Sequence, residues 1–585
     1  MKKTILLLFF SITIIGYSQE TETENESIVT QFLNNLTGSF ESNAQWYTND
    51  KELGDFSDPN FPSDDEPFRA NSYLRLDYNF LSNFSVGVQF ESYEPLPLLN
   101  YYTGYKGTDI ATYYANYKND KLDVTAGHFY EQFGSGLLLR AFEERQLGLN
   151  NALRGGRIKY APTEFLNFTA LYGQPRIGFK TSDSEIFGFD TNIDLSNALK
   201  IENISTFNLG LSYVGKNESF IPQDANFDTS DFPEMVHSYA ARVDLDFGKF
   251  YTSAEYSIKG KDAIYTPASA GIPEIIEGEY FDGNALLVNL GYTKKGLGIS
   301  GTLRRMENMA FFSERGYSVP GNNNFNMLST NYVPALTKQQ DYSLANIYIY
   351  QAQPTLQIQD FAGQAGEIGG QFDVFYKFNK ESTLGGKYGT KVSANFSYWA
   401  LLDATFDQNN STYNAEFLKF GSRLNRDFNL EIRKKLSKNW SGIFTYINTI
   451  IDKGVTLGGP LGVQGDIKSS IIIAEATHKI GKGKSIRVEA QHLSTKQDNK
   501  NWAGATIEYN ATNAIAFYVN DAYNYGNDVK DDQIHYYNIG GSYTKGASRV
   551  ALNYGRQRGG LLCVGGVCRF VPENTGLTVN LTTSF

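Results

Sequence analysis

Long apolar runs are missing from most of this 585-residue sequence, as are the residues on which catalytic and metal sites depend. It contains two cysteines, five histidines and four tryptophans. After residue 18, no segment approaches the roughly twenty apolar residues that a membrane-spanning helix requires. Metal-ligand pairs at the usual spacing, phosphate-binding loops and Gly-x-Ser-x-Gly motifs are also lacking. We therefore expect neither an enzyme nor a bound metal or other cofactor.

The N-terminus carries the one strongly apolar run. Lys2 and Lys3 precede an almost continuous apolar stretch at residues 4–15, and a short exit ends at Ser18. This pattern predicts a secretory signal peptide over residues 1–18. No cysteine lies near its end, which argues against a lipid anchor. Removing the two lysines changes the formal net charge from -11 to -13, so a nucleic-acid partner is not expected.

Alternation of apolar and polar residues recurs along the rest of the chain. In the first clear hairpin, Leu74 and Leu76 share one face of a strand while Arg75 and Asp77 share the other. The connections between successive strands alternate between short turns and long polar loops. This predicts an all-β, antiparallel up-and-down barrel of about 24 strands (roughly 20–26) over residues 36–585, after a short segment at residues 19–35. Residues 176–214 are the hardest to assign.

A soluble β-sandwich or propeller would show the same alternation. Aromatic residues make up 14% of the chain, as expected for a transmembrane barrel with aromatic girdles. Together with the signal peptide and the unequal turns, this favours an integral outer-membrane barrel with short periplasmic turns and long extracellular loops. An even number of strands would place both termini in the periplasm.

The last strand supports this interpretation. Leu577, Val579, Leu581 and Phe585 alternate with polar residues up to the C-terminus. This resembles the closing strand by which the barrel-assembly machinery recognises outer-membrane proteins. With the Tyr17-Ser18-Gln19 exit and the richness in Tyr and Asn, the whole chain resembles the large, porin-like outer-membrane barrels of Bacteroidetes-type bacteria. The resemblance implies contact with outer-membrane lipids and with that machinery, and it supplies no site residues.

The segment 127–160 is unusually dense in charge. We interpret it as an inward-folded loop whose charges line a constriction, as in porins, or anchor the loop to the wall. A solvated extracellular loop is the plainer alternative. The candidate residues are Arg140, Glu143, Glu144, Arg145, Arg154 and Arg157.

Two other groups are weaker candidates. One acidic loop could collect Ca²⁺, but its spacing matches no calcium loop and favours a solvated loop instead; it contains Asp50, Asp55, Asp58, Asp64, Asp65 and Glu66. A barrel esterase would need a histidine inside. Alternation places four histidines outward and leaves His478 ambiguous; the four are His128, His237, His492 and His535.

The two cysteines flank a Gly-Gly pair. Gly565-Gly566 suits a type I′ hairpin turn, in which both central residues have positive φ. Cys563 and Cys568 then face each other as a non-hydrogen-bonded pair, close enough for a disulfide. The expected export favours oxidation, so we predict a disulfide within the last extracellular loop.

Charges of both signs alternate along the expected inner wall, and a barrel of this size encloses a wide lumen. That lumen must be filled with water, with loops such as Glu307 to Gly366, or with another chain. The leading hypothesis is a porin-like channel or transporter for small polar solutes. The alternative is a non-conducting partner barrel or surface scaffold that docks other envelope proteins through aromatic residues of the long loop, namely Phe325, Tyr332, Tyr342, Tyr348 and Tyr350.

Overall fold

The fold is known from a computed structural model. The structure describes residues 34–59, 66–99, 101, 104–222, 225–267, 273–313, 315, 329–353, 366–407, 412–458 and 461–585. The expected signal peptide, Asp64, Asp65 and Phe325 lie outside the described residues.

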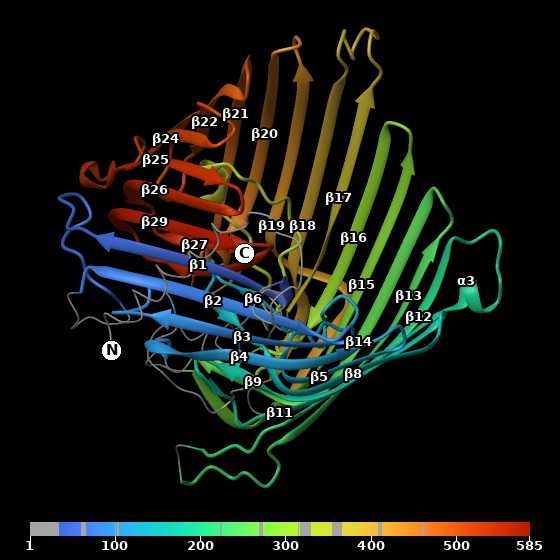
Figure 1. Ribbon diagram of the computed structural model, residues 1–585. Helices are drawn as coiled ribbons and strands as arrows, with labels where there is room; N and C mark the ends of the chain where they lie inside the picture. Colours follow the sequence, from blue (N-terminus) through green and yellow to red (C-terminus); the bar gives the residue numbers. More distant parts are fainter. Residues whose placement is uncertain are drawn as a thin grey trace, which may run out of the picture.

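Twenty-four antiparallel strands form one closed ring (Figure 1). Each strand pairs with its neighbours in the chain, so the topology is up-and-down as predicted. The ring consists of β1 (Leu36–Tyr47), β2 (Phe68–Phe80), β3 (Phe84–Tyr93), β4 (Gly107–Lys118), β5 (Leu122–Phe129), β8 (Leu153–Thr163), β9 (Leu166–Ile177), β11 (Glu185–Asp194), β12 (Thr206–Asn217), β13 (Met235–Asp246), β14 (Phe250–Pro267), β15 (Pro273–Lys294), β16 (Leu297–Glu307), β17 (Gly366–Phe378), β18 (Thr390–Asp407), β19 (Thr412–Lys435), β20 (Trp440–Asp452), β21 (Asp466–Gly481), β22 (Lys484–Thr495), β23 (Trp502–Asn510), β24 (Ile515–Tyr523), β25 (His535–Lys545), β26 (Ser548–Gln557) and β29 (Asn574–Ser584).

A few short elements accompany the ring. Strand β10 (Lys180–Thr181) pairs antiparallel with the end of β9, while β6 (Glu143–Glu144) pairs with β7 (Leu149–Asn150) and β27 (Gly560–Val564) with β28 (Val567–Val571). The helices are α3 (Leu195–Ala198), α4 (Lys453–Leu457), η2 (Ser343–Asn346) and η3 (Lys530–Asp532). Among the described residues, no helix has the length and apolarity needed to cross a bilayer.

The last strand closes the ring against the first. Strand β29 pairs with β26 on one side and with β1 on the other. The Gly38 amide donates to the Phe585 carbonyl at 2.8 Å, and the Phe585 amide donates back at 3.0 Å. A Cβ at Gly38 would lie 2.5 Å from the Phe585 ring, so glycine makes room for it. Recognition of this strand by an assembly machinery stays a prediction.

The two faces of the sheet follow the expected alternation. Arg75 and Asp77 pair inside, with their Nε and Oδ2 atoms 2.7 Å apart, while Phe80 and Phe84 stack outside. In β21, Ile471 and Ile473 are buried on the inner face and Ile472 is 48% exposed on the outer face. Strict alternation with the outward Tyr113 predicts that Ala111 lies outside, and this is wrong: a register shift between Gln89 and Phe90 turns Ile110 outward and buries Ala111.

The ends of the barrel differ. Short turns join the strands at one end, where β1 begins and β29 ends, and long segments join them at the other (Figure 1). We call these the short-turn end and the long-loop end. Residues 176–214, the least certain part of the prediction, form the end of β9, then β10, β11, α3 and most of β12. The longest strand, β19, has 24 residues.

All five histidines lie beside aromatic rings of the outer face. The ring centroids are 4.9 Å apart for His128 and Tyr113, and 4.3 Å for His478 and Trp440. Because Trp440 is 45% exposed, this settles the ambiguous face of His478 as outward. The remaining pairs are His237 with Tyr213, His492 with Tyr525, and His535 with Tyr523.

Candidate functional site in the lumen

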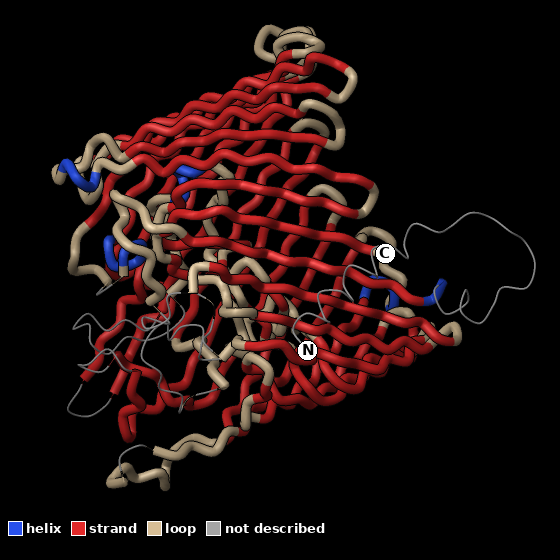
Figure 2. The backbone as a smooth tube through the Cα atoms, turned by 60° about the vertical axis from the view of Figure 1, so that its left-hand side comes forward, coloured by secondary structure: helices blue, strands red, loops and turns tan. Residues whose placement is uncertain are grey.

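Loop segments lie inside the ring of strands (Figure 2). We call them the lumen segments: the described parts of residues 94–105 and 308–353, all of residues 130–152, and the β27–β28 hairpin. They bond to inward residues around the ring and to one another. The described parts of the long loop between β16 and β17 therefore lie inside, which is one of the fillings of the lumen considered from the sequence.

The segment 130–152 packs on the inner wall through an apolar turn. Gly134 and Gly136 adopt positive φ values of 51° and 90°. This turn brings the Ser135 amide to the Glu255 carboxylate at 2.8 Å. Three consecutive leucines that follow, Leu137 to Leu139, are at most 3% exposed and join a cluster with Phe311 of the long loop. Apolar burial therefore holds this loop against the wall.

Ion pairs add to this attachment. Arg145 contacts Glu41 of β1, with Nη1 and Oε2 2.7 Å apart, and Glu143 at 3.2 Å. Glu143 also accepts a hydrogen bond from Gln89 of β3 at 2.9 Å. Arg157 of β8 reaches back to Glu131 at 3.4 Å. These charges join the loop to the wall, which is the anchoring alternative considered from the sequence.

The six candidate charges do not come together as one ring. Arg140 donates to the Tyr332 carbonyl at 2.8 Å and so joins two lumen segments. The Glu144 carboxylate accepts a hydrogen bond from the nearby Gln146 backbone amide, at 3.1 Å. Arg154 pairs in register with the outward His128 and is exposed on the outer face. The expectation that Arg154 faces the lumen is therefore wrong, because it shares the parity of the outward Ile158.

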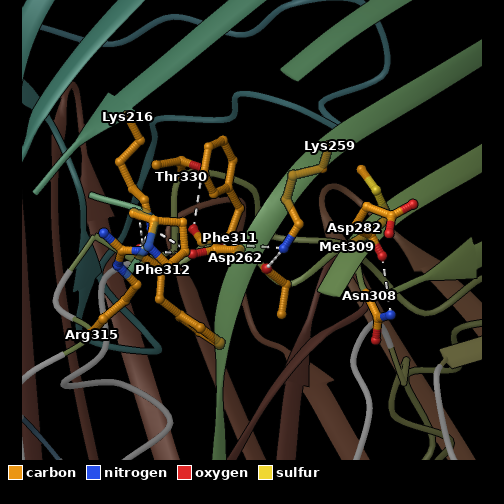
Figure 3. A network of polar contacts seen from close by, with 12 residues as sticks. Lys216, Lys259, Asp262, Asp282, Asn308, Met309, Phe311, Phe312, Arg315 and Thr330 are labelled. Atoms are coloured by element: carbon orange, nitrogen blue, oxygen red, sulfur yellow. Dashed lines mark hydrogen bonds and ion pairs between the residues drawn. The ribbon is translucent and has the colours of Figure 1, made fainter. Parts of the chain in front are cut away.

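Buried charges fix the first part of the long loop (Figure 3). Asp262 of β14 lies between Lys216, Lys259 and Arg315, at N–O distances of 3.4, 3.4 and 2.9 Å. Arg315 of the loop also pairs with Glu218 at 2.9 Å. All five side chains are at most 8% exposed. Removing charges from water is costly, so such a cluster depends on every partner being present.

The same lysines hold the loop backbone. Lys259 donates to the Ala310 carbonyl at 2.7 Å and Lys216 to the Phe312 carbonyl at 2.5 Å (Figure 3). The ammonium groups of Lys216 and Lys259 lie over the ring of Phe311, 5.1 and 5.7 Å from its centroid, respectively. The wall thus holds the loop through hydrogen bonds to its backbone carbonyls as well as through ion pairs.

A second buried pair holds the later part of the loop. Arg304 of β16 and Glu367 of β17 approach to 2.6 Å, and Arg304 also donates to the Pro334 carbonyl at 2.6 Å. Glu367 accepts hydrogen bonds from the Tyr350 hydroxyl and from the Gln353 amide. Tyr350 and Gln353 both belong to the long loop. We call Arg304 and Glu367 the β16–β17 latch.

Beyond this latch the loop lies on an apolar wall. Leu344 of η2 is fully buried, and Tyr342, Tyr348 and Tyr350 are at most 7% exposed. They pack against inward residues of β18 to β23, including Trp399, Leu401, Ile451, Ile471, Leu493 and Trp502. The proposed docking surface is therefore wrong for these tyrosines, because they face the inner wall.

The predicted disulfide is confirmed. Cys563 and Cys568 are bonded, with Cα atoms 4.0 Å apart, across a turn in which Gly565 and Gly566 have φ values of 57° and 81°. The hairpin joins two other lumen segments: the Gly566 carbonyl accepts from the Ala335 amide at 2.8 Å, and Arg569 donates to the Leu147 carbonyl at 2.6 Å. Burial lowers the pKa of Arg569 to about 10, so it stays cationic at neutral pH.

The acidic loop is partly tied down rather than solvated. Asp50 pairs with Arg556 of β26 at 2.6 Å, and Asp58 pairs with the buried Arg69 of β2. Within the described ranges, no group of three or more His, Cys, Asp or Glu residues is placed to hold a metal ion.

Sequence reasoning did not find the buried charges around Asp262 or the β16–β17 latch. Alternation places Lys216 and Lys259 on the inner face, near the long-loop ends of their strands. The inward position of these two lysines was the only sequence feature that could have indicated a buried ionic contact. Their partners come from other segments, Arg315 among them, and alternation carries no information about such contacts.

This architecture defines a class: a large, closed β-barrel with its own loops inside. The chain belongs to the family of unknown function DUF6029, which matches residues 1–585.

The solved structures that the chain resembles share little sequence with it. The siderophore receptor PirA from Pseudomonas aeruginosa is 10% identical, with a TM-score of 0.40 over 97% of this chain and 81% of that one. The P pilus usher PapC translocation pore is 9% identical, with a TM-score of 0.39 over 94% and 99%. The outer-membrane transporter YddB from Escherichia coli is 9% identical, with a TM-score of 0.40 over 94% and 81%. No curated protein matches the chain.

Proposed function

We propose that this protein is an outer-membrane channel or transporter for small polar solutes, closed at rest by its own lumen segments. The observation that supports the proposal most is the loop-filled lumen of a closed barrel. The outer face displays large apolar side chains such as Leu290 and Ile539, which are 56% and 59% exposed and suit lipid. We also propose that the short turns face the periplasm. The sequence resemblance described above supports an organism of the Bacteroidetes type.

A polar inner wall supports passage of polar solutes. Toward the short-turn end, Asp373 accepts hydrogen bonds from Gln371 and Asn395 at 2.9 and 2.8 Å. Asn116 of β4 donates to Asp123 of β5 at 2.7 Å. A wall of this kind can stay wet, and a barrel of 24 strands is wide enough for water once the loops withdraw.

Conductance in planar bilayers tests this proposal. We expect wild-type protein to be mostly silent and Glu367→Ala to show frequent openings, because Arg304, Tyr350 and Gln353 lose their shared acceptor. Asp373→Asn is the matched control. It lies on the same strand and also faces inward, but its bonds are to wall residues. It should behave as wild type.

A filled lumen also fits the second candidate, a non-conducting partner barrel or scaffold. Silence of both wild type and Glu367→Ala, in correctly folded protein, would refute transport and favour the scaffold. Large, stable steps from wild type alone would instead refute closure by the loops. Pull-down from native membranes would identify the partners that a scaffold requires.

A further inference from the structure

Basic residues gather along one arc of the short-turn end. Four consecutive turns, from β15–β16 to β21–β22, carry lysines at the strand ends and tips (Figure 1). We call them the basic rim: Lys294, Lys295, Lys377, Lys380, Lys387, Lys391, Lys434, Lys435, Lys438, Lys479, Lys482 and Lys484. All are exposed except the half-buried Lys391. Between these strand ends the turns contain one carboxylate, Glu381, and the structure gives none of the twelve lysines an ion pair.

Part of the rim faces into the mouth of the barrel. Lys377, Lys391 and Arg433 lie directly opposite one another on β17, β18 and β19, on the inward face. Arg433 pairs with Glu431, with Nε and Oε1 2.5 Å apart, and Lys391 lies over the Phe375 ring at 4.8 Å. Like charges in direct register are destabilising. An anionic group at this mouth would offset their repulsion.

The chain itself contains a matching anion. Glu20, Glu22, Glu24 and Glu26 precede β1 without an intervening cation. We propose that the basic rim binds this acidic segment, Glu20–Glu26, of the same chain. This is a surface beyond the transport proposal and does not depend on it.

Position and reach support this pairing. Strand β1 starts at the short-turn end, where Leu36 pairs with Tyr78. Six strand spacings separate β1 from β22 in the ring, about 30 Å in total. The ten residues from Glu26 to Leu36 can span at most about 35 Å. The lysines of the β21–β22 turn are therefore the part of the rim within reach of Glu26. The inward row on β17 to β19 lies nine to eleven spacings from β1, about 43–53 Å, and comes within reach only of the start of the segment, because the sixteen residues from Glu20 to Leu36 span at most about 56 Å.

Tethering makes weak contacts sufficient. Exposed ion pairs are individually weak and are screened by salt. A linked segment, however, meets its site at an effective concentration in the millimolar range. Lipid headgroups could reach outward lysines such as Lys294, but they cannot reach Lys377 and Lys391 inside the mouth. The inward row therefore favours a peptide segment over a lipid surface.

Carbodiimide cross-linking of the purified full chain in detergent tests the proposal, with cross-links located by mass spectrometry. We expect cross-links from the acidic segment to Lys479, Lys482 and Lys484 at low salt. Their yield should fall about ten-fold near 1 M salt, where the Debye length is only about 3 Å. Replacing these three lysines by glutamine should abolish them.

Lys118 and Lys121 provide the matched control. They lie at the β4–β5 turn of the same end, about three strand spacings from β1 and so nearer than the rim. Lys118→Gln with Lys121→Gln should leave the cross-links to the rim unchanged. Cross-links divided equally between Lys118, Lys121 and the rim would overturn the proposal. So would rim lysines that are protected from acetylation only in vesicles containing phosphatidylglycerol, since the rim would then be a lipid surface.

Discussion

Two sides of the inner wall hold the same long loop by different means. On the β12–β17 side, buried ions bind it: Asp262 gathers Lys216, Lys259 and Arg315, and Glu367 pairs with Arg304. On the β18–β23 side, the loop rests on apolar side chains such as Trp399 and Ile471. The ionic side demands particular partners, whereas the apolar side demands mainly volume and shape.

This difference explains where the wall is polar. Nearer the short-turn end, inward strand residues are charged or amide side chains that bond to one another, as Asp373 and Asn395 show. Beyond the latch, apolar wall residues pack against Leu344 and its neighbours, while Gln491 of the same wall accepts a hydrogen bond from the Leu344 amide. Because buried charges hold the loop on the β12–β17 side, the polarity of the inner wall reports how the loop is held rather than which parts it covers.

The largest effect is expected on the ionic side. Asp262→Asn removes the carboxylate that the three buried cations share, and removing one partner of a buried pair typically costs about 3–5 kcal/mol. The first part of the long loop should detach and expose Arg315 to trypsin, read as peptides that end at Arg315. Asp244→Asn, an inward substitution on β13, is the control. Equal protection of Arg315 in both variants would contradict the ionic anchor.

Leu344→Ala tests the apolar side. Truncating a fully buried leucine typically costs about 2–5 kcal/mol, according to how well the cavity collapses. Hydrogen exchange should rise in residues 343–350, while cleavage at Arg315 should stay as in wild type, because the charged cluster around Asp262 shares no contact residue with the apolar side. The exposed Leu384→Ala is the control. Joint release of both parts by either variant would show one cooperative unit instead of two anchors.

A smaller change tests the outer wall against the inner. Val243→Arg places a charge on the lipid face of β13, at a cost of about 2–4 kcal/mol near the midplane. Its neighbour Asp244→Asn changes the inner face and should be mild. Refolding into vesicles, followed by heat-modifiable gel migration, measures the folded fraction. Tolerance of Val243→Arg together with failure of Asp244→Asn would mean that inside and outside are reversed.

The barrel could be predicted from sequence because its signal is local. A period of two fixes which side chains share a face, and short turns fix which strands pair. The prediction was ambiguous at His478 because both faces of its strand are apolar at Ile471 to Ile473: the loop covers one face and the other is exposed. It was wrong at Ala111, because one bulge shifts the register and leaves no clear sequence mark.

The lumen contacts could not be predicted in the same way. Arg140 donates a hydrogen bond to the backbone carbonyl of Tyr332, 192 residues away. Because every residue has a backbone carbonyl, the sequence does not indicate which one will be the acceptor. Asp262 and Arg315 meet only because the loop turns inward. By contrast, Cys563 and Cys568 are five residues apart across a Gly-Gly turn, so local geometry was enough to predict their bond.

That disulfide should give the smallest effect, and it lies where the long loop and the segment 130–152 meet. Cys563→Ser removes a bridge that closes a very short loop, so the expected loss is about 2 kcal/mol and stays local to the hairpin. The hairpin meets the Ala335 amide and the Leu147 carbonyl, so hydrogen exchange at Ala335 should rise while unfolding of the barrel in denaturant stays unchanged. Wild type with its disulfide reduced is the matched control and should show the same change. A large loss of barrel stability in Cys563→Ser would show that the hairpin supports the wall. Labelling of two free thiols in unreduced, denatured wild type would refute the disulfide itself.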